Sequence, residues 1–172
     1  MRLFFALWPD DATRAALAGA AALLNLRDGR LTARADLHLT LAFLGEVPDT
    51  HVEALCEMAA TLRAPGFDLT VSAAGWWRRS HVAWLAPGAV PAPLAALAAA
   101  LHRGAERPFD DTGSYRPHIT VARGVRRPPG LAASFSVPWQ VRDFALISSN
   151  SSGSGPRYQC LAQWPLTPAV FD

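Results

Sequence analysis

Two short stretches of this chain repeat a pattern that could carry out acid–base chemistry. The sequence HLTLAFLG spans 38–45 and HITVARGV spans 118–125, so each begins with His-x-Thr. Histidine exchanges protons near neutral pH and is the commonest general acid or base. A threonine hydroxyl can donate a hydrogen bond to a phosphate oxygen. The pattern predicts one neutral and one protonated histidine acting on the same phosphate ester.

Both motifs lie in segments with the alternation of a β-strand. Alternate side chains of a strand share a face, so His38 lies with Thr40, and His118 with Thr120. The opposite face of the first strand, formed by Leu37, Leu39, Leu41 and Phe43, is expected to pack on a helix. The polar faces must line water or a cleft, because burying these groups without partners is costly. One such motif occurs often by chance, but two in matching strands favour a shared cleft.

Strands and helices alternate along the chain, which predicts an α+β fold with antiparallel hairpins. A strand, a helix and a His-x-Thr strand follow one another in each half. Expected strands cover 2–8, 37–45, 67–77, 81–87, the second motif, 134–147 as one or two strands, and 157–166. Expected helices cover 11–26, from 49 or 50 to 63, and 91–105, with a short extended piece at 30–35.

The composition excludes several classes of protein. Half of the 172 residues are hydrophobic and the net charge is only +2, so a packed core is expected rather than disorder. All 16 basic residues are arginines, a bias that a GC-rich genome explains without a nucleic-acid partner. Cys56 and Cys160 have no metal-ligand spacing and are too few for a disulfide framework. The apolar run near the N-terminus is too short for a signal peptide or a membrane-spanning helix, so we expect a cytoplasmic protein with no membrane partner.

The motif segments resemble a known family. LHLTLAFLGE (37–46) and YRPHITVAR (115–123) are similar to the paired signatures of the 2H phosphoesterase superfamily. The closest branch is the RNA 2′,3′-cyclic phosphodiesterases of bacteria and archaea, also called 2′-5′ RNA ligases. The resemblance covers essentially the whole chain, through RLFFALWPDD (2–11), FDLTVSAAGWWRRSHVAWLAP (67–87), FALISS (144–149), GPRY (155–158) and WPL (164–166).

This resemblance implies a single bilobal domain over residues 1–172. Each of two pseudo-symmetric lobes would be an antiparallel sheet with helices outside, and a central cleft would carry one motif per lobe. The implied reaction is hydrolysis of RNA 2′,3′-cyclic phosphate ends to 2′-phosphomonoesters, with reverse 2′-5′ ligation as a second activity. By the same resemblance, His38 donates a proton to the leaving 3′ oxygen, His118 accepts one from water, and Thr40 and Thr120 hold the phosphate. The resemblance implies no metal and no cofactor.

Three further residues are candidates for the cleft. Arg123 matches an arginine that follows the second motif in the family, which suggests a phosphate ligand. It stands five residues after His118, however, so a regular strand would point it away from the cleft unless a bulge turns it. Phe43 and Tyr115 are candidates for stacking on a terminal base, as is Trp8.

The remaining polar residues have simpler interpretations. We expect His51, His81 and His102 to be structural or exposed, and Asp110–Asp111 to form a turn rather than a metal site. The arginine pairs 78–79 and 126–127 fit exposed turns, although they could also meet an RNA backbone. Most tryptophans are expected in the core.

Two alternative functions stay open at this point. One is a 2H esterase for another substrate, such as 2′-5′ oligoadenylate, an ADP-ribose cyclic phosphate or a small cyclic nucleotide; comparing rates on these would separate them. The other is a non-catalytic module that binds RNA ends, which tight binding of a 2′-phosphate without turnover would reveal. We expect a monomer whose partners are RNA ends or nucleotides bearing a 2′,3′-cyclic phosphate.

Overall fold

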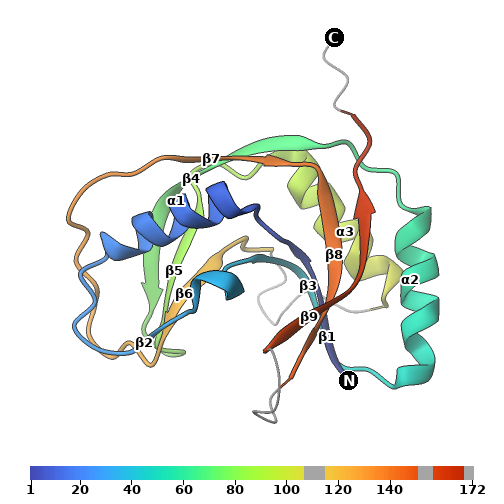
Figure 1. Ribbon diagram of the computed structural model, residues 1–172, viewed down its shortest axis with the longest axis horizontal. Helices are drawn as coiled ribbons and strands as arrows, with labels where there is room; N and C mark the ends of the chain where they lie inside the picture. The colour runs from blue at the N-terminus through green and yellow to red at the C-terminus, as the bar shows by residue number, and fades with distance from the viewer. Residues whose placement is uncertain (107–114, 151–156, 169–172) are drawn as a thin grey trace.

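The computed structural model describes residues 1–106, 115–150 and 157–168, which form two lobes side by side (Figure 1). The helices are α1 (Asp11–Ala22), α2 (Val52–Thr61) and α3 (Ala92–Gly104), with 3₁₀ turns at Arg34–Asp36 and Asp49–His51. The strands are β1 (Arg2–Leu7), β2 (Arg30–Leu31), β3 (Leu39–Glu46), β4 (Phe67–Trp77), β5 (Val82–Pro87), β6 (Ile119–Arg123), β7 (Val137–Val141), β8 (Asp143–Ser149) and β9 (Tyr158–Pro165).

The strands form two antiparallel sheets whose orders correspond. One sheet has the order β3-β1-β8-β9 and the other the order β2-β6-β5-β4-β7. In each sheet the motif strand, β3 or β6, pairs with the strand that precedes a helix, β1 or β5. The predicted α+β class, with one motif strand in each antiparallel sheet, is confirmed.

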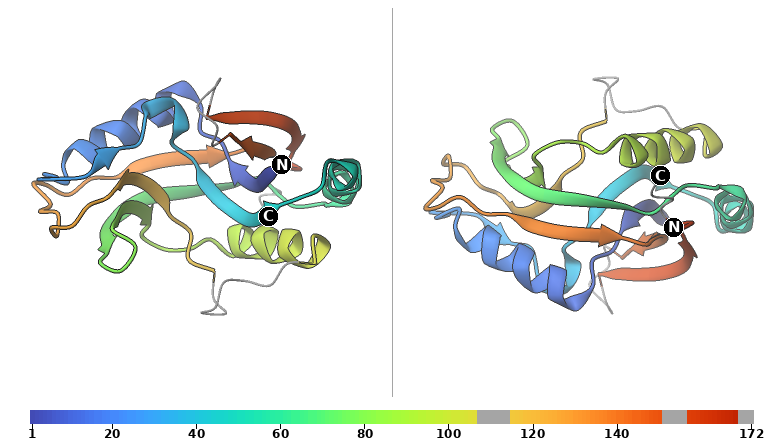
Figure 2. Two further views of the ribbon diagram at one scale, coloured as in Figure 1. Left: turned by 90° about the horizontal axis from the view of Figure 1, so that it is seen from below. Right: turned by 90° about the horizontal axis from the view of Figure 1, so that it is seen from above.

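The lobes do not correspond to the two halves of the sequence. The C-terminal strands β8 and β9 complete the sheet that begins with β1, and β2 joins the sheet of the second motif. The helices cross as well: α1 contacts β7 of the five-stranded sheet, whereas α3 contacts β3 of the four-stranded one. Figure 2 shows α1 over one sheet and α2 with α3 beside the other. The repeated order of strand, helix and His-x-Thr strand predicts the order of elements along the chain. It does not predict that each of these helices packs on the other lobe's sheet.

Apolar side chains fill the space between and around the two sheets. A single cluster of buried residues includes Leu3 and Leu39 from the first sheet together with Leu69 and Val121 from the second. A smaller cluster lies on the opposite face of the first sheet. It is formed by Phe4, Ala6, Ala145 and Ile147, with Trp8 and Tyr158 packed against it. Strand β1 is therefore covered on both faces, which explains its continuous apolar sequence.

Helix α1 is shorter than predicted. Its start is fixed by Asp10, whose side chain accepts a hydrogen bond from the Thr13 backbone N–H at 2.7 Å. It ends at Ala22 rather than near residue 26, and Asn25 then adopts a left-handed φ of 44°. Helix α3 follows the expected range closely. Among the described residues, no helix is both long and apolar enough to cross a membrane.

Candidate active site

A bulge in β6 turns Arg123 into the cleft. The pairing with β5 matches Thr120 to Trp84 and Ala122 to Ala83, so Val121 is an extra residue in β6. Such a bulge shifts the alternation by one residue, and Val121 and Ala122 are accordingly both buried. Beyond it, Arg123 points to the same side as Thr120, and both line one cavity. The sequence predicts that Arg123 reaches the cleft only if a bulge turns it, and this is that bulge.

Strand β3 contains the same irregularity after its own threonine. Its pairing with β1 matches Thr40 to Ala6 and Ala42 to Phe5, which leaves Leu41 as the extra residue. Phe43 therefore turns toward the cleft and is 50% exposed. The prediction that Phe43 shares the core-facing side with Leu39 and Leu41 is wrong for this reason. Phe43 and Arg123 each stand five residues after the motif histidine, so they are equivalent positions of the two lobes.

The two histidines are held in the same way by the backbone. Nδ1 of His38 lies 2.7 Å from the Asp36 carbonyl oxygen, and Nδ1 of His118 lies 2.9 Å from that of Arg116. A carbonyl oxygen can only accept, so Nδ1 carries the hydrogen in both rings. The other ring nitrogen, Nε2, is left as the atom that can exchange a proton with a ligand.

Aromatic rings enclose His38 on three sides. Its ring stacks on Phe4 at 4.9 Å and on Trp8 at 5.1 Å between centroids, and the edge of Tyr158 lies 5.1 Å away. Phe4 in β1 and Trp8 just after it are four residues apart and point to the same side, so the imidazole lies between their rings. Burial is the main reason that the pKa of His38 is lowered to about 4. The hydrogen bond to the Asp36 carbonyl raises this pKa, but by less. The positive charges of Arg123 and Arg157, and of His118 when it is protonated, lower it further.

Both imidazoles line one small cavity. Its volume is about 80 Å³, and its walls are formed by Thr32, His38, Thr40, His118, Thr120, Arg123, Arg157 and Tyr158. His118 contacts the edge of Trp77, with 4.5 Å between ring centroids, rather than lying against the rings that stack on His38. The structure thus brings together the four motif residues and Arg123, all singled out from the sequence, and adds Arg157.

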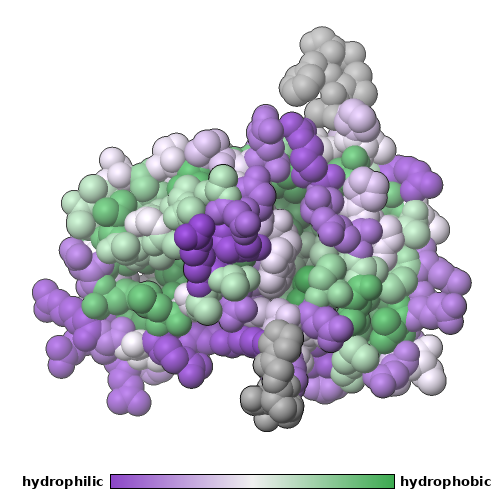
Figure 3. All heavy atoms as spheres, viewed as in Figure 1, coloured by the Kyte–Doolittle hydropathy of each residue, from purple (hydrophilic) through white to green (hydrophobic). Residues whose placement is uncertain are grey.

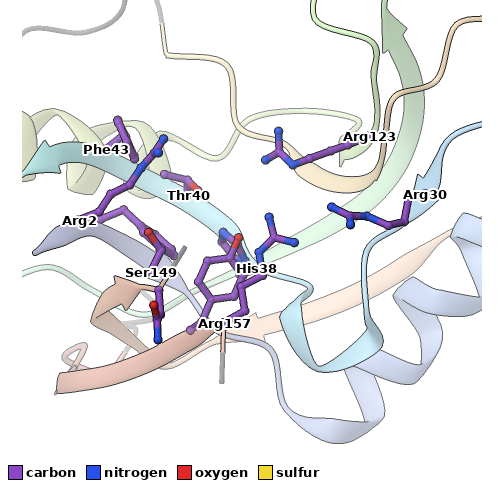
Figure 4. Close-up of a pocket in the computed structure, with 11 residues that line it drawn as sticks. Arg2, Arg30, His38, Thr40, Phe43, Arg123, Ser149 and Arg157 are labelled. Carbon is purple, nitrogen blue, oxygen red and sulfur yellow. The ribbon is translucent and has the colours of Figure 1, made fainter. Parts of the chain in front are cut away.

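The small cavity opens into a larger one of about 660 Å³ that is rich in arginine. Arg2, Arg30, Arg123 and Arg157 line it with His38, Thr40 and Phe43, and no carboxylate is among its described lining residues (Figure 4). Arg2 and Phe43 lie at one end, where the guanidinium stands 5.0 Å from the ring centroid, and Arg30 lies at the other. This surplus of positive charge suits an anionic ligand.

Sequence reasoning missed three of these arginines. Arg2, Arg30 and Arg157 stand at or next to the ends of β1, β2 and β9, far apart in the sequence. None forms part of a local motif. The segment GPRY, which contains Arg157, carried a family resemblance and was the only signal for it in the sequence.

Tyr115 has a different place from the one predicted. Its hydroxyl donates a 3.0 Å hydrogen bond to the Thr40 carbonyl oxygen, and its ring packs against the main core. Burial raises the pKa of this hydroxyl well above its ordinary value. Tyr115 is not among the described residues that line either cavity, which argues against a stacking role. It instead ties the segment before His118 to the strand of the first motif.

Comparison with known proteins identifies the family. A family model described as the 2′-5′ RNA ligase superfamily matches residues 9–153. The chain belongs to this superfamily. Its relatives include the RNA 2′,3′-cyclic phosphodiesterase of Escherichia coli K12, 37% identical over 96% of this chain and 97% of that protein. The protein of the same name from Thermus thermophilus is 32% identical over 96% and 90%.

Solved structures share the fold of this chain. Escherichia coli LigT in complex with 3′-AMP matches with a TM-score of 0.81 and 38% identity, covering 96% of this chain and 98% of that one. TT0787 of Thermus thermophilus matches with a TM-score of 0.80 and 28% identity, covering 99% and 100%. The resemblance stated from the motifs is therefore confirmed for the family and the fold.

The other polar residues of this superfamily member lie outside the site. His51 and His81 are exposed, and His102 is buried in α3 at 9% exposure. Of the tryptophans expected in the core, Trp139 is buried, whereas Trp76 and Trp164 are half-buried against that core. Trp84 is also half-buried, and Trp77 contacts His118. Trp8, a candidate for the cleft, contacts His38. Asp110–Asp111 lies outside the described residues. Within the described part of the chain, no group of three or more His, Cys, Asp or Glu side chains could hold a metal ion.

We expect His38 to titrate near pH 4 in the free protein, measurable from the imidazole NMR signals. In Arg157→Gln the His38 pKa should rise, because a repulsive charge is removed, whereas Arg63→Gln, just after α2, should leave it unchanged. Since the folded-state pKa lies below the ordinary 6.5, this residue lowers stability as the pH falls from about 6.5 to about 4. A wild-type value near 6.5 would contradict the described burial.

Proposed function

We propose that this protein hydrolyses 2′,3′-cyclic phosphate ends of RNA to 2′-phosphomonoesters by two-histidine acid–base catalysis. The observation that carries the proposal is the small cavity in which His38 and His118 meet between two threonines and two arginines. Its volume of about 80 Å³ suits a single phosphate group. The name RNA 2′,3′-cyclic phosphodiesterase, borne by relatives that align over nearly the whole chain, agrees with this chemistry.

The reaction requires one proton to be removed and one to be supplied. Nε2 of His118 accepts a proton from water as the water oxygen forms a bond to phosphorus. The bond from phosphorus to the 3′ oxygen breaks, and that oxygen takes the proton from Nε2 of His38. The ribose then bears a 3′ hydroxyl and a 2′ phosphomonoester. A 5′ hydroxyl in place of water would give 2′-5′ ligation by the same proton transfers.

The donor role of His38 depends on the substrate. The free protein holds His38 neutral at pH 7, because its pKa is about 4. A bound phosphate anion lies between this imidazole and the arginines that repel its charged form. The anion offsets that repulsion and favours the imidazolium. The rings of Phe4 and Trp8, stacked on both faces, also attract a cation. Proton uptake by His38 is therefore coupled to substrate binding.

The remaining lining residues hold the phosphate and the base. Thr40 and Thr120 can each donate a hydroxyl hydrogen to a phosphate oxygen, and Arg123 and Arg157 can each present a planar fork. In the proposed complex, negative charge that builds up on phosphorus meets donors that are already in place. Phe43, exposed at the end of the larger cavity, offers its ring to the terminal base.

Replacing Phe43 with alanine should weaken binding rather than the chemical step. Stacking of a base on an aromatic ring is worth about 1–3 kcal/mol, so KM for a 2′,3′-cyclic nucleotide should rise by about 5- to 160-fold with kcat little changed. Phe43→Trp keeps an aromatic face and should retain most of the affinity. Steady-state kinetics on both variants check this. An equal loss in kcat would instead mean that Phe43 shapes the site itself.

The proposal is tested by incubating the protein with a 2′,3′-cyclic nucleotide in excess chelator and assigning the product. A 2′-monophosphate formed by the wild type, and lost with His38 or His118, is the expected result. A 3′-monophosphate, or turnover that survives both substitutions, would refute it. Tight binding of a 2′-phosphate end with no turnover would favour a binding module. Faster turnover of 2′-5′ oligoadenylate than of the cyclic nucleotide would favour the alternative of a 2H esterase for another substrate.

A further inference from the structure

Five arginines outside the active site gather at one end of the five-stranded sheet. They come from three loops: Arg27 precedes β2, Arg78–Arg79 form the β4–β5 turn, and Arg126–Arg127 follow β6. All five are exposed. We call these five residues the distal arginine cluster. Figure 3 shows hydrophilic residues concentrated at the lower left, where β2 lies in Figure 1.

Hydrogen bonds hold the three loops against one another. The backbone N–H of Val125 donates to the His81 carbonyl oxygen at 3.0 Å, which joins the third loop to the β4–β5 turn. Oδ1 of Asp28 accepts from the backbone N–H groups of Arg126 and Arg127 at 3.1 and 3.4 Å. The arginines therefore belong to one surface, although they lie up to 100 positions apart in the sequence.

The charge of this surface is not neutralised within the described structure. Asp28 is the only carboxylate in the segments 27–30, 78–81 and 124–127, and its oxygen already accepts from backbone groups. None of the five arginines forms an ion pair with a described carboxylate. Like charges gathered without counterions repel one another, so the arrangement favours an anionic partner.

The cluster begins where the active-site cleft ends. Arg30 and Arg123 are paired across β2 and β6, and both line the larger cavity. Arg126 follows Arg123 by three residues, so their Cα atoms are at most about 11 Å apart. A polyanion that leaves the cleft past Arg30 and Arg123 would meet the cluster next. The spacing suits a phosphate backbone better than a compact anion.

We infer that the distal arginine cluster binds the phosphate backbone of the RNA strand whose end reacts in the cleft. The preferred substrate is then an RNA strand rather than a mononucleotide. Arginine is suited to this contact because its planar fork matches phosphate, and each contact displaces condensed counterions. This inference rests on the proposed function for the identity of the strand. The contacts of the cluster itself can be tested without turnover.

Two pair variants and a matched control test the inference. Arg78→Gln/Arg79→Gln and Arg126→Gln/Arg127→Gln each remove two charges from the cluster. The Asp28 contacts use backbone N–H groups, so these substitutions leave them in place. Arg63→Gln/Arg103→Gln removes two exposed charges near the ends of α2 and α3 and serves as the control.

The assays compare a 2′,3′-cyclic mononucleotide with a short single-stranded RNA ending in a 2′,3′-cyclic phosphate. We expect each cluster pair to lower kcat/KM for the RNA by about tenfold or more at low salt, and to reduce the salt slope by about 1.4. The mononucleotide rate and the control pair should be unchanged. Equal rates on RNA for cluster and control pairs would overturn the inference, as would an equal loss on the mononucleotide.

A binding measurement separates this inference from the proposed function. RNA ending in a 2′-phosphate is titrated against the same variants at several salt concentrations. Weaker binding by the cluster pairs alone supports the inference even if no variant turns over a cyclic phosphate. Loss of binding to anionic vesicles or to an acidic protein, with RNA binding intact, would assign the cluster to another partner and overturn it.

Discussion

His38→Gln and His118→Gln should each lower kcat for a 2′,3′-cyclic nucleotide by about 10²- to 10⁴-fold. Glutamine can form a hydrogen bond but cannot transfer a proton at neutral pH, so it removes the chemistry and keeps a polar group. The double variant should be little slower than either single one, because an acid and a base that act in one step are not additive. Rates in steady state and in single turnover measure the effect.

The control for this prediction is His81→Gln, an exposed histidine in the β4–β5 turn that should retain full activity. Removing the ring between Phe4 and Trp8 also leaves a gap at His38, so folding must be checked by denaturant unfolding. A folded His38 or His118 variant with wild-type activity would show that the paired motifs are structural.

Arg123→Gln should lower kcat/KM by about 10²- to 10³-fold, the loss typical of one charge-stabilising donor. Arg123 lines the small cavity with both histidines. In the proposed mechanism its charge would act where negative charge increases during the reaction. Arg30→Gln is the matched comparison, because Arg30 lines only the larger cavity and is the β-sheet partner of Arg123. We expect a smaller effect there, mainly on KM.

The comparison also tests the bulge at Val121. If β6 were regular, Arg123 would point away from the phosphate, and the two substitutions would have similar, small effects. Kinetics of both variants on the same cyclic nucleotide decide the matter. Equal losses would show that position in the small cavity gives Arg123 no special role.

The motif faces could be predicted from the sequence because strand alternation is a local property. His38 and Thr40 lie on one side of the first motif strand and Leu37, Leu39 and Leu41 on the other, without knowledge of what pairs with the strand. The bulges could not be predicted in this way. An extra residue is defined by the partner strand, and Val121 or Leu41 has no local feature that marks it. Strict alternation therefore holds only up to each threonine. After the extra residue, Leu41 or Val121, it gives the wrong side for Phe43 and for Arg123.

The arginines of the cleft and the aromatic enclosure of His38 depend on tertiary structure. Arg2, Arg30 and Arg157 line one cavity because the ends of three strands from two sheets face it. The enclosure had a signal in the sequence, since Phe4, Ala6 and Trp8 alternate with Leu3, Phe5 and Leu7. What the sequence could not indicate was that the first motif strand pairs with β1 and brings His38 between Phe4 and Trp8.

The most direct test of the paired acid–base roles uses a substrate whose leaving group needs no proton. In a 2′,3′-cyclic analogue with sulfur in place of the bridging 3′ oxygen, the thiolate leaves unprotonated. We predict that His38→Gln recovers most of its lost kcat/KM on this analogue, whereas His118→Gln stays inactive because water must still be deprotonated. Recovery of His118→Gln instead, or of neither variant, would contradict the assignment of His38 as donor and His118 as acceptor.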